Sequence, residues 1–154
     1  MTKTAFHIIE ISAKETYSVR QPVLRAGRPL ADCAFVNDDL ESTLHFGLYK
    51  GDLLIGVATF LLQNSKLFPE RIQYQLRGMA ILEPYQGQKL GDLLLRHGEH
   101  ILQQQKAQRI WCNAREKASR FYKKHDYASI GEPFEIPDVG THYVMSKPIA
   151  ADTL

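Results

Sequence analysis

The chain has 154 residues, of which 44% are hydrophobic and 23% are charged, and its formal net charge is +2. These values are typical of one globular domain, which we expect to span residues 1–154, and the charge is too small to indicate nucleic-acid or membrane binding by bulk electrostatics. The sequence shows neither a signal run at its start nor an apolar stretch long enough to cross a bilayer. Cys33 and Cys112 lie far apart without a C-x-x-C pattern, so we expect a reduced, cytoplasmic protein without a metal site.

The first quarter of the chain predicts a strand followed by a helix. Phe6–Ile11 is apolar enough for a strand, and Ser12 and Glu15 have the spacing of a capping box that begins a helix running towards Leu24. Arg25–Asp39 is polar and contains glycine and proline, which predicts loops or a short helix.

The middle of the chain predicts three strands and a helix. Leu44–Tyr49 and Leu53–Leu62 are apolar runs joined by a hairpin signal at Lys50–Asp52. Tyr74–Leu82 is the next predicted strand. Gly91–Gln105 is predicted to be helical because its apolar residues recur on one side.

The last third predicts a buried strand at Arg109–Ala114, a helix at Lys117–Lys124 and a final strand that contains Tyr143–Met145 and ends before Pro148. The complete order is β-α-β-β-β-α-β-α-β-β. This order predicts a mixed α/β fold with a central sheet.

The segment Arg77–Leu95 combines an apolar strand, a turn containing Gly87, and the start of an apolar helix. The first backbone N–H groups of a helix have no partner within it and can bind a phosphate. A P-loop would require Gly-Lys-Ser/Thr at the helix start, but Lys89 is followed by Leu90 and Gly91. A Rossmann fingerprint would require a third glycine, so neither of these motifs fits.

Gln86-Gly87-Gln88-Lys89-Leu90-Gly91 resembles the pyrophosphate-binding motif Gln/Arg-x-x-Gly-x-Gly/Ala of the GNAT superfamily of acyl-CoA-dependent N-acetyltransferases. Lys89 stands at the middle glycine, which is costly for a side chain if that position requires a positive φ. Ala118–Tyr127 is similar to the superfamily's downstream pattern Ala-x-x-Phe-Tyr-x-x-x-Gly-Phe. The resemblance covers the chain from about Leu44 to Lys147. It implies a mostly antiparallel central sheet flanked by helices.

The resemblance also implies acetyl-CoA as the acyl donor, with no metal. In the superfamily, backbone N–H groups of the loop hold the pyrophosphate and the preceding strand contacts the pantetheine arm. The tyrosine that matches Tyr122 commonly protonates the leaving thiolate there, while a packing role is the alternative for this residue. The residues expected to bind the cofactor are Met79, Ala80, Ile81, Gln86, Gly87, Gln88, Lys89, Leu90, Gly91, Asp92, Asn113 and Tyr122.

Asn113 is one of two candidates for a polar contact with the cofactor. Many family members carry an asparagine seven positions before the tyrosine, but Arg115 occupies that position here. Asn113 and Arg115 are two residues apart on a strand and therefore point to the same face. Either side chain is able to reach the cofactor or the acceptor, and a structural or solvent-facing role is the alternative for each.

The sequence offers several candidates for the general base. We favour His142 because Gly140-Thr141-His142 has a loop composition, and we also consider His45, Glu135 and solvent. His45 and Glu135 are expected to line the acceptor site. Arg25 and Arg28 suit a carboxylate or phosphate on the acceptor.

The predicted function is direct transfer of the acetyl group of acetyl-CoA to a primary amine of an unidentified small molecule or peptide. No Cys-His or Ser-His nucleophile motif is present, which favours direct transfer over a covalent enzyme intermediate. The alternatives are a non-catalytic acyl-CoA-binding regulatory module with a GNAT fold and a purely structural domain. The sequence leaves homodimer formation open.

Overall fold

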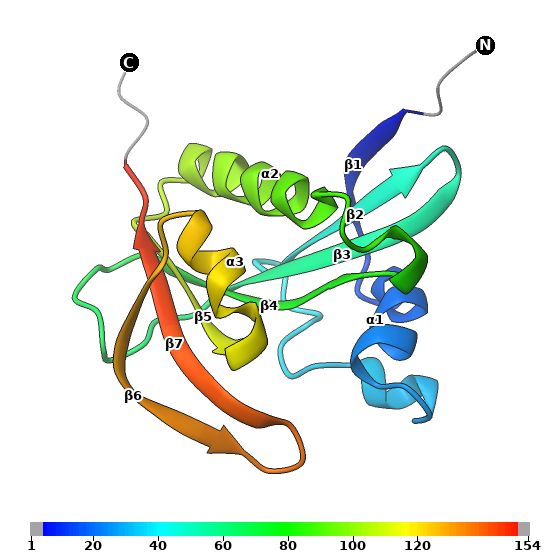
Figure 1. The fold of residues 1–154 in the computed structure, drawn as a ribbon. Coiled ribbons are helices and arrows are strands. Elements are labelled where there is room, and N and C mark those ends of the chain that lie inside the picture. Colours follow the sequence, from blue (N-terminus) through cyan, green and yellow to red (C-terminus); the bar gives the residue numbers. More distant parts are fainter. Residues whose placement is uncertain (1–4, 151–154) are drawn as a thin grey trace. The chain divides into compact units, whose positions relative to one another are not determined.

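The computed structural model describes residues 5–150 and contains seven strands with the helices that connect them (Figure 1). Residues 1–4 and 151–154 lie outside the described range. Most of the N-terminal segment, in which we expected no signal sequence, is therefore not described. The elements are β1 (Phe6–Ile11), η1 (Lys14–Thr16), α1 (Tyr17–Leu24), η2 (Leu30–Cys33), β2 (Leu44–Lys50), β3 (Leu53–Leu62), β4 (Gln73–Ile81), η3 (Glu83–Tyr85), α2 (Leu90–Gln104), β5 (Arg109–Arg115), η4 (Glu116–Ala118), α3 (Ser119–Lys124), β6 (Ala128–Ile136) and β7 (Gly140–Pro148).

The seven strands form one sheet in the order β1-β2-β3-β4-β5-β7-β6. β1 pairs with β2, β2 with β3, β5 with β7, and β6 with β7, all antiparallel. β4 and β5 are parallel and pair at Gln73–Arg109, Tyr74–Ile110 and Gln75–Trp111. The sheet is therefore mixed and mostly antiparallel, which confirms the predicted fold class.

The chain divides into two compact units. The first contains the described residues up to Leu61 together with Leu76–Ile101, and the second contains Leu62–Gln75 together with the described residues from Leu102 onward.

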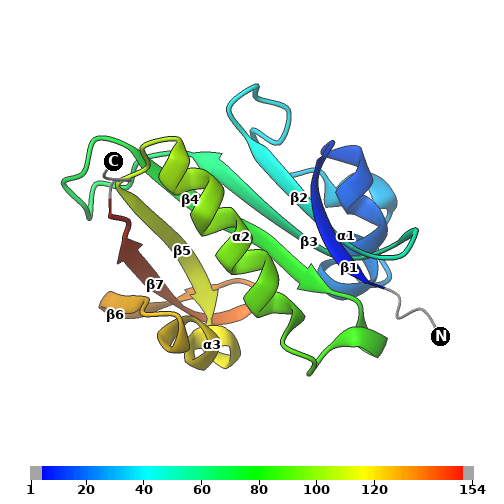
Figure 2. The ribbon, with the colours of Figure 1, turned by 90° about the horizontal axis from the view of Figure 1, so that it is seen from above.

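In the first unit, α1 and α2 lie on opposite faces of the strands (Figures 1 and 2). A Cβ at Gly56 of β3 would contact Leu94 of α2, and a Cβ at Gly98 of α2 would contact Phe60 of β3. The even-numbered residues of β3 therefore face α2. Val57 instead packs with Val19 of α1, together with Ile11 and Ala80. This alternation follows from the two-residue period of a strand, and it buries both faces of β3.

The beginning of α1 confirms the predicted capping box. The backbone N–H of Ser12 donates to the Glu15 carboxylate at 3.0 Å, and the N–H of Glu15 donates to the Ser12 hydroxyl at 3.3 Å. The first turn is a 3-10 helix, and α1 then continues to Leu24 as predicted. The predicted bounds of β3 are confirmed, and those of β4 and α2 differ from the structure by one residue.

The prediction that His142 lies in a loop is wrong. Gly140–Pro148 forms β7, in which His142 pairs with Arg115 of β5 and with Phe134 of β6. The turn comes earlier: the N–H of Val139 donates to the Ile136 carbonyl at 3.0 Å, after which β7 begins at Gly140. The glycine therefore marks the end of a tight hairpin turn.

In the second unit, two polar side chains hold the segment between β3 and β4. The guanidinium of Arg109 donates two hydrogen bonds of 2.8 Å to the two carboxylate oxygens of Glu70. The buried side chain of Gln73 donates to the carbonyls of Phe68 and Glu70 and accepts from the N–H of Ser65. Each contact satisfies backbone or charged groups that would otherwise be costly to bury.

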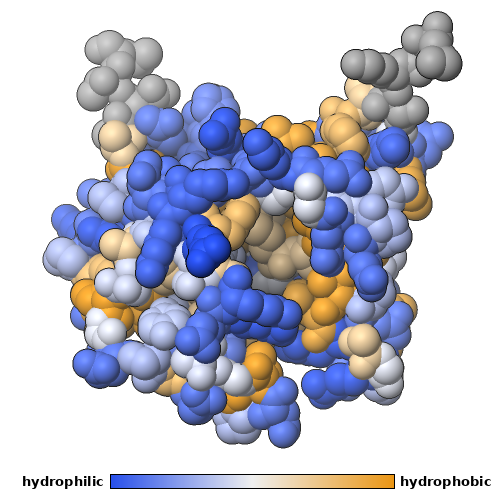
Figure 3. Space-filling view, in the orientation of Figure 1, coloured by the Kyte–Doolittle hydropathy of each residue, from blue (hydrophilic) through white to orange (hydrophobic). Residues whose placement is uncertain are grey.

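On the face of the molecule in Figure 3, hydrophilic residues surround smaller groups of hydrophobic ones. None of the helices within residues 5–150 is long and apolar enough to span a membrane. The same residues contain no group of three or more His, Cys, Asp or Glu side chains arranged to hold a metal ion.

The close contact between α2 and β3 predicts that Gly98→Ala destabilises the protein by about 1 kcal/mol or more. A Cβ at Gly98 would lie 2.2 Å from Cζ of Phe60, which is itself fully buried. Overpacking costs about 1–3 kcal/mol, which exceeds the gain of about 1 kcal/mol in helix propensity. Urea unfolding measures the change in the free energy of unfolding.

The matched control is the same substitution in a Phe60→Leu background, where the shorter side chain removes the obstruction. We expect Gly98→Ala to be less harmful there, giving a coupling energy between the two sites. Additive effects of the two substitutions would contradict the close packing.

Candidate active site

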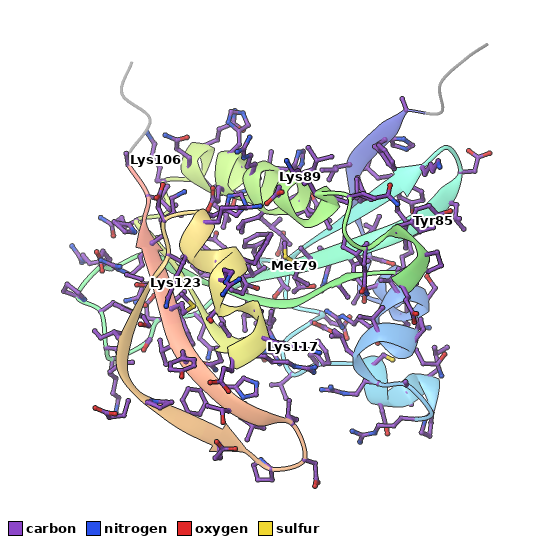
Figure 4. All side chains as sticks on the ribbon, in the orientation of Figure 1. Met79, Tyr85, Lys89, Lys106, Lys117 and Lys123 are labelled. Carbon is purple, nitrogen blue, oxygen red and sulfur yellow. The ribbon has the colours of Figure 1, made fainter. Side chains whose placement is uncertain are left out.

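The loop before α2 has the backbone conformation that the sequence motif implies. Gly87 has φ +79° and Lys89 has φ +62°, and α2 begins at the next residue, Leu90. The position of the motif's middle glycine therefore does require a positive φ, and Lys89 adopts it at a cost in conformational energy. Figure 4 labels Lys89 beside the first turn of α2, together with Met79 of β4 and Tyr85 of η3.

The loop offers backbone donors. Within residues 5–150, the N–H groups of Gly87, Gln88 and Lys89 donate to no protein acceptor. All three residues are exposed, and a Cβ at Gly87 would meet no atom within 4 Å. The 15-residue helix α2 adds a partial positive charge at this end. The loop therefore fits an anionic group such as a pyrophosphate.

Gln86 fastens this loop to the end of β4. Its side-chain amide donates a hydrogen bond of 2.8 Å to the carbonyl of Ile81, and η3 lies between the two residues. The backbone N–H of Gln86 donates to the Glu83 carbonyl at 3.1 Å. The Gln86 side chain thus positions the loop against β4.

Gly78 interrupts β4 within the segment expected to contact the cofactor. It has φ +65°, and a Cβ there would lie 2.9 Å from Cε2 of Phe35. Arg77 and Ala80, three residues apart, contact groups on the same face, Phe35 and Val19 respectively. A regular strand would place them on opposite faces, so Gly78 has the effect of a β-bulge.

A buried ion pair lies beside this bulge. Arg20 is fully buried and donates from Nη1 to Asp38 Oδ2 at 2.6 Å and to the Cys33 carbonyl at 2.8 Å. Its Nη2 donates to Asp38 Oδ1 at 3.2 Å and to the Thr59 hydroxyl at 2.8 Å. This network joins α1, η2, β3 and the loop that precedes β2.

His45 belongs to the same network, which was not expected from the sequence. Its Nε2 lies 2.8 Å from the Asp38 carbonyl, and its Nδ1 lies 2.8 Å from the Thr59 hydroxyl. Because a carbonyl only accepts, Nε2 carries a proton. The ring is buried, and both nitrogens are occupied by internal contacts, which describes a structural histidine.

The two arginines predicted for the acceptor site differ in their surroundings. Arg28 forms an exposed ion pair with Asp32 at 3.0 Å, so its charge is already balanced. Arg25 lies at the end of α1, where its Nη1 donates to the Leu24 carbonyl and its guanidinium lies 5.2 Å from the Phe35 ring centre. Arg77 and Phe35 were missed by sequence reasoning, although an arginine in an otherwise apolar strand is a recognisable signal.

Tyr122 is buried in α3 of the second unit. Its ring makes edge contacts with Phe121 and Tyr127 at centroid distances of 5.2 and 5.6 Å. Burial, and secondarily the nearby Cys112, raise the pKa of the phenol far above its ordinary value. Tyr122 therefore remains a proton donor throughout the physiological pH range.

Asn113 is the one exposed position of β5. Cys112 lies close enough to Tyr122 to raise the pKa of its phenol, so Cys112 faces α3 and Asn113 faces the other side. The contact of Asn113 with the cofactor stays a prediction, as does that of Arg115 on the same face.

His142 and Glu135 lie on neighbouring strands of the β6–β7 hairpin. His142 is buried, with Nδ1 2.8 Å from the Gly140 carbonyl and its ring 5.8 Å from that of Phe134. Its Nδ1 therefore carries the proton, which leaves Nε2 as an acceptor in the neutral ring. Glu135 is exposed, and its carboxylate accepts a hydrogen bond from the Thr141 hydroxyl.

Comparison with known proteins agrees with this geometry. A model of the acetyltransferase (GNAT) family matches residues 7–127. The chain is 40% identical over 139 residues to the uncharacterized N-acetyltransferase YitI of Bacillus subtilis (strain 168), which covers 90% of this chain and 93% of that protein. The chain therefore belongs to the GNAT family and is an acyltransferase, as the sequence motifs predicted.

Solved structures share the fold at low sequence identity. A putative N-acetyltransferase from Lactobacillus plantarum aligns with a TM-score of 0.78 and 22% identity over 95% of this chain and 99% of that one. An aminoglycoside 6'-N-acetyltransferase complexed with coenzyme A aligns with a TM-score of 0.75 and 12% identity over 96% and 99% of the two chains. Members of the GNAT family use acetyl-CoA as cosubstrate and act on amines.

The positive φ of Lys89 predicts that Lys89→Gly raises the free energy of unfolding by about 0.5 kcal/mol. Relief of the left-handed penalty, about 1–2 kcal/mol, exceeds the added entropy of glycine in the unfolded chain, about 0.5–1 kcal/mol. Gln88→Gly is the control, because Gln88 does not have a positive φ, and it should lower stability. Equal effects of the two substitutions in urea unfolding would show that Lys89 is not strained.

Proposed function

We propose that this enzyme transfers the acetyl group of acetyl-CoA directly to a primary amine of a small molecule or peptide. The observation that carries the proposal is the row of unpartnered N–H groups at Gly87–Lys89, placed at the start of α2 and fastened to β4 by Gln86. Such donors suit the pyrophosphate of the cosubstrate. The β4 residues Met79, Ala80 and Ile81 would align its pantetheine arm through main-chain contacts, next to the bulge at Gly78.

The cysteines support direct transfer rather than a covalent enzyme intermediate. A cysteine nucleophile must be a thiolate, but burial raises the pKa of Cys112 to about 12. Cys33, the other cysteine of the chain, is fully buried. Acetyl-CoA supplies an acyl group already activated as a thioester, so the protein has mainly to orient the reactants and manage two protons.

Tyr122 and His142 are the groups we assign to the two proton transfers. The phenol of Tyr122 donates its proton to the departing sulfur as the carbon–sulfur bond breaks. The unprotonated Nε2 of His142, directly or through a water, accepts the proton that the attacking amine loses. The tautomer of His142 supports the second assignment, and the phenol of Tyr122 is protonated at neutral pH, as the first assignment requires.

The proposal as a whole is tested by calorimetric titration of CoA and by a screen of acceptors with acetyl-CoA, read out as thiol release. We expect CoA to bind and at least one class among small amines, amino acids and peptide N-termini to cause thiol release. Replacing Gly87 with valine should weaken CoA binding, because the position has a positive φ and lies among the donors. Failure of the wild-type protein to bind CoA would overturn the proposal.

Tyr122→Phe is expected to lower the single-turnover rate of acetyl transfer by about tenfold to a thousandfold, because a positioned proton donor acts mainly in the transition state. The ring remains, so the dissociation constant of acetyl-CoA should change little. Tyr127→Phe, which removes another buried phenol of the same unit, is the matched control. An unchanged rate in Tyr122→Phe would make Tyr122 a packing residue.

His142→Gln should lower turnover by about a hundredfold or more, the contribution expected of a general base, with CoA affinity preserved. Glutamine can still donate to the Gly140 carbonyl, so the hairpin should keep its fold, which circular dichroism checks. Full activity in the folded variant would assign the proton transfer to solvent or to Glu135.

A further inference from the structure

Three guanidinium groups gather around one aromatic ring in the first unit. The Cζ atoms of Arg20, Arg25 and Arg77 lie 4.0, 5.2 and 5.2 Å from the ring centre of Phe35. They come from α1, from the residue that ends α1, and from β4. We call Arg25, Phe35 and Arg77 the arginine cluster.

The charges of the cluster are not balanced within the protein. Arg20 is paired with Asp38, whose carboxylate also accepts a hydrogen bond of 2.9 Å from the N–H of Phe35. In the part of the chain that the structure describes, Arg25 and Arg77 form no ion pair. Each donates one hydrogen bond to a backbone carbonyl, of Leu24 and Val36 respectively. Two guanidinium groups beside the same ring therefore carry charges that no carboxylate pairs with, and most of their donors are unused.

Such an arrangement is costly without a partner. Burial lowers the pKa of Arg77, whereas Asp38 raises it by more than the neighbouring Arg20 lowers it. The Nε of Arg20 is buried and has no hydrogen-bond acceptor, and it faces Gly78 at 3.3 Å from the position of an added Cβ. The ring of Phe35 offsets part of the repulsion through cation–π contacts, but a ring carries no net charge. An anion that accepts hydrogen bonds from Arg25 and Arg77 beside the Phe35 ring would supply the missing charge.

The cluster lies where an acceptor would approach β4. Arg77 directly precedes the bulge at Gly78 and the Met79–Ile81 segment. It faces the side of the sheet that α1 covers, whereas α2 and its N-terminal loop lie on the opposite side (Figures 1 and 2). The two reactants can therefore reach β4 from opposite faces.

From this placement we propose that the amine acceptor carries a carboxylate, bound by the guanidinium groups of Arg25 and Arg77. This inference rests on the proposed acetyltransferase function. Because Arg77 is only two residues from Met79, the amine and the carboxylate should be separated by a few bonds, as in a free amino acid. Planar guanidinium groups match a carboxylate through paired hydrogen bonds, which lysine cannot reproduce.

The first experiment measures binding without turnover. Free amino acids and their carboxamides are compared by saturation-transfer NMR on the CoA-loaded protein. We expect the amino acids to bind at least tenfold more tightly than the matched amides, and Arg77→Met or Arg25→Met to remove this preference. Equal binding of the two series, or a preference that survives both substitutions, would overturn the inference.

The second experiment measures acetyl transfer to the best acceptor of each series. Arg77→Met and Arg25→Met should each raise KM for the carboxylate acceptor by about 10- to 100-fold, the range of a lost charge-assisted hydrogen bond, and should raise KM for the carboxamide much less. Arg77→Lys keeps the positive charge but loses the paired hydrogen bonds of the guanidinium, so its KM should lie between those of wild type and Arg77→Met. Arg96→Met, an exposed arginine on α2, is the control for charge alone.

The outcomes separate the inference from the function on which it rests. Unchanged CoA affinity and melting temperature in the variants would show that the fold and the cofactor loop are intact. Transfer to amines with no preference for a carboxylate would overturn the inference and leave the acetyltransferase proposal standing. Stronger binding of amines that carry a phosphomonoester would also overturn it. Absence of both CoA binding and thiol release in the wild-type protein would overturn the proposed function itself.

Discussion

The guanidinium of Arg20 is the constraint on which the first unit depends. It is fully buried and makes four hydrogen bonds, to Asp38, Thr59 and the Cys33 carbonyl. Removing one partner of a buried ion pair costs about 3–5 kcal/mol, because the other charge is left without compensation. The pair therefore holds the irregular chain between α1 and β2 against the sheet, and the second hydrogen bonds of Asp38 and Thr59 fix Phe35 and His45 in turn.

As a consequence, the two faces of β4 have different neighbours: arginine side chains on the α1 side and the loop before α2 on the α2 side. Gly78 allows Phe35 to approach the backbone, since a side chain there would meet both the Phe35 ring and Arg20. The bulge brings Arg77 and Ala80 to the α1 side, where the unbalanced arginines lie. On the α2 side, the side chain of Gln86 donates to the carbonyl of Ile81 and so holds the loop before α2 against β4. β4 thus lies between the loop that we propose binds the cosubstrate and the arginines that we propose bind the acceptor.

Much of the fold was predictable because its signals are local. The Ser12–Glu15 capping box, the β3 run and the glycine turn before α2 each depend on residues within one or two turns of one another. The predicted order includes a strand at the place of β6, but no local signal fixed its bounds, because Gly131 and Pro133 interrupt it and its register shifts between Ile130 and Phe134. His142 was misassigned for a related reason: its strand is defined by partners on β5 and β6, which neighbouring residues do not reveal.

The candidate site divides in the same way. The proposed cofactor loop is contiguous in sequence and could be predicted from it, whereas the arginine cluster joins positions 25, 35 and 77, which only the tertiary fold brings together. Positions 78 and 89 show how backbone geometry limits which residue types are tolerated. At Gly78 both the positive φ and the space under Phe35 exclude a side chain. At Lys89 only the φ is unfavourable, because the residue is exposed, so a lysine is tolerated at about 1–2 kcal/mol. The lysine side chain places a positive charge beside the unpartnered N–H groups, where it would add to the attraction of an anion.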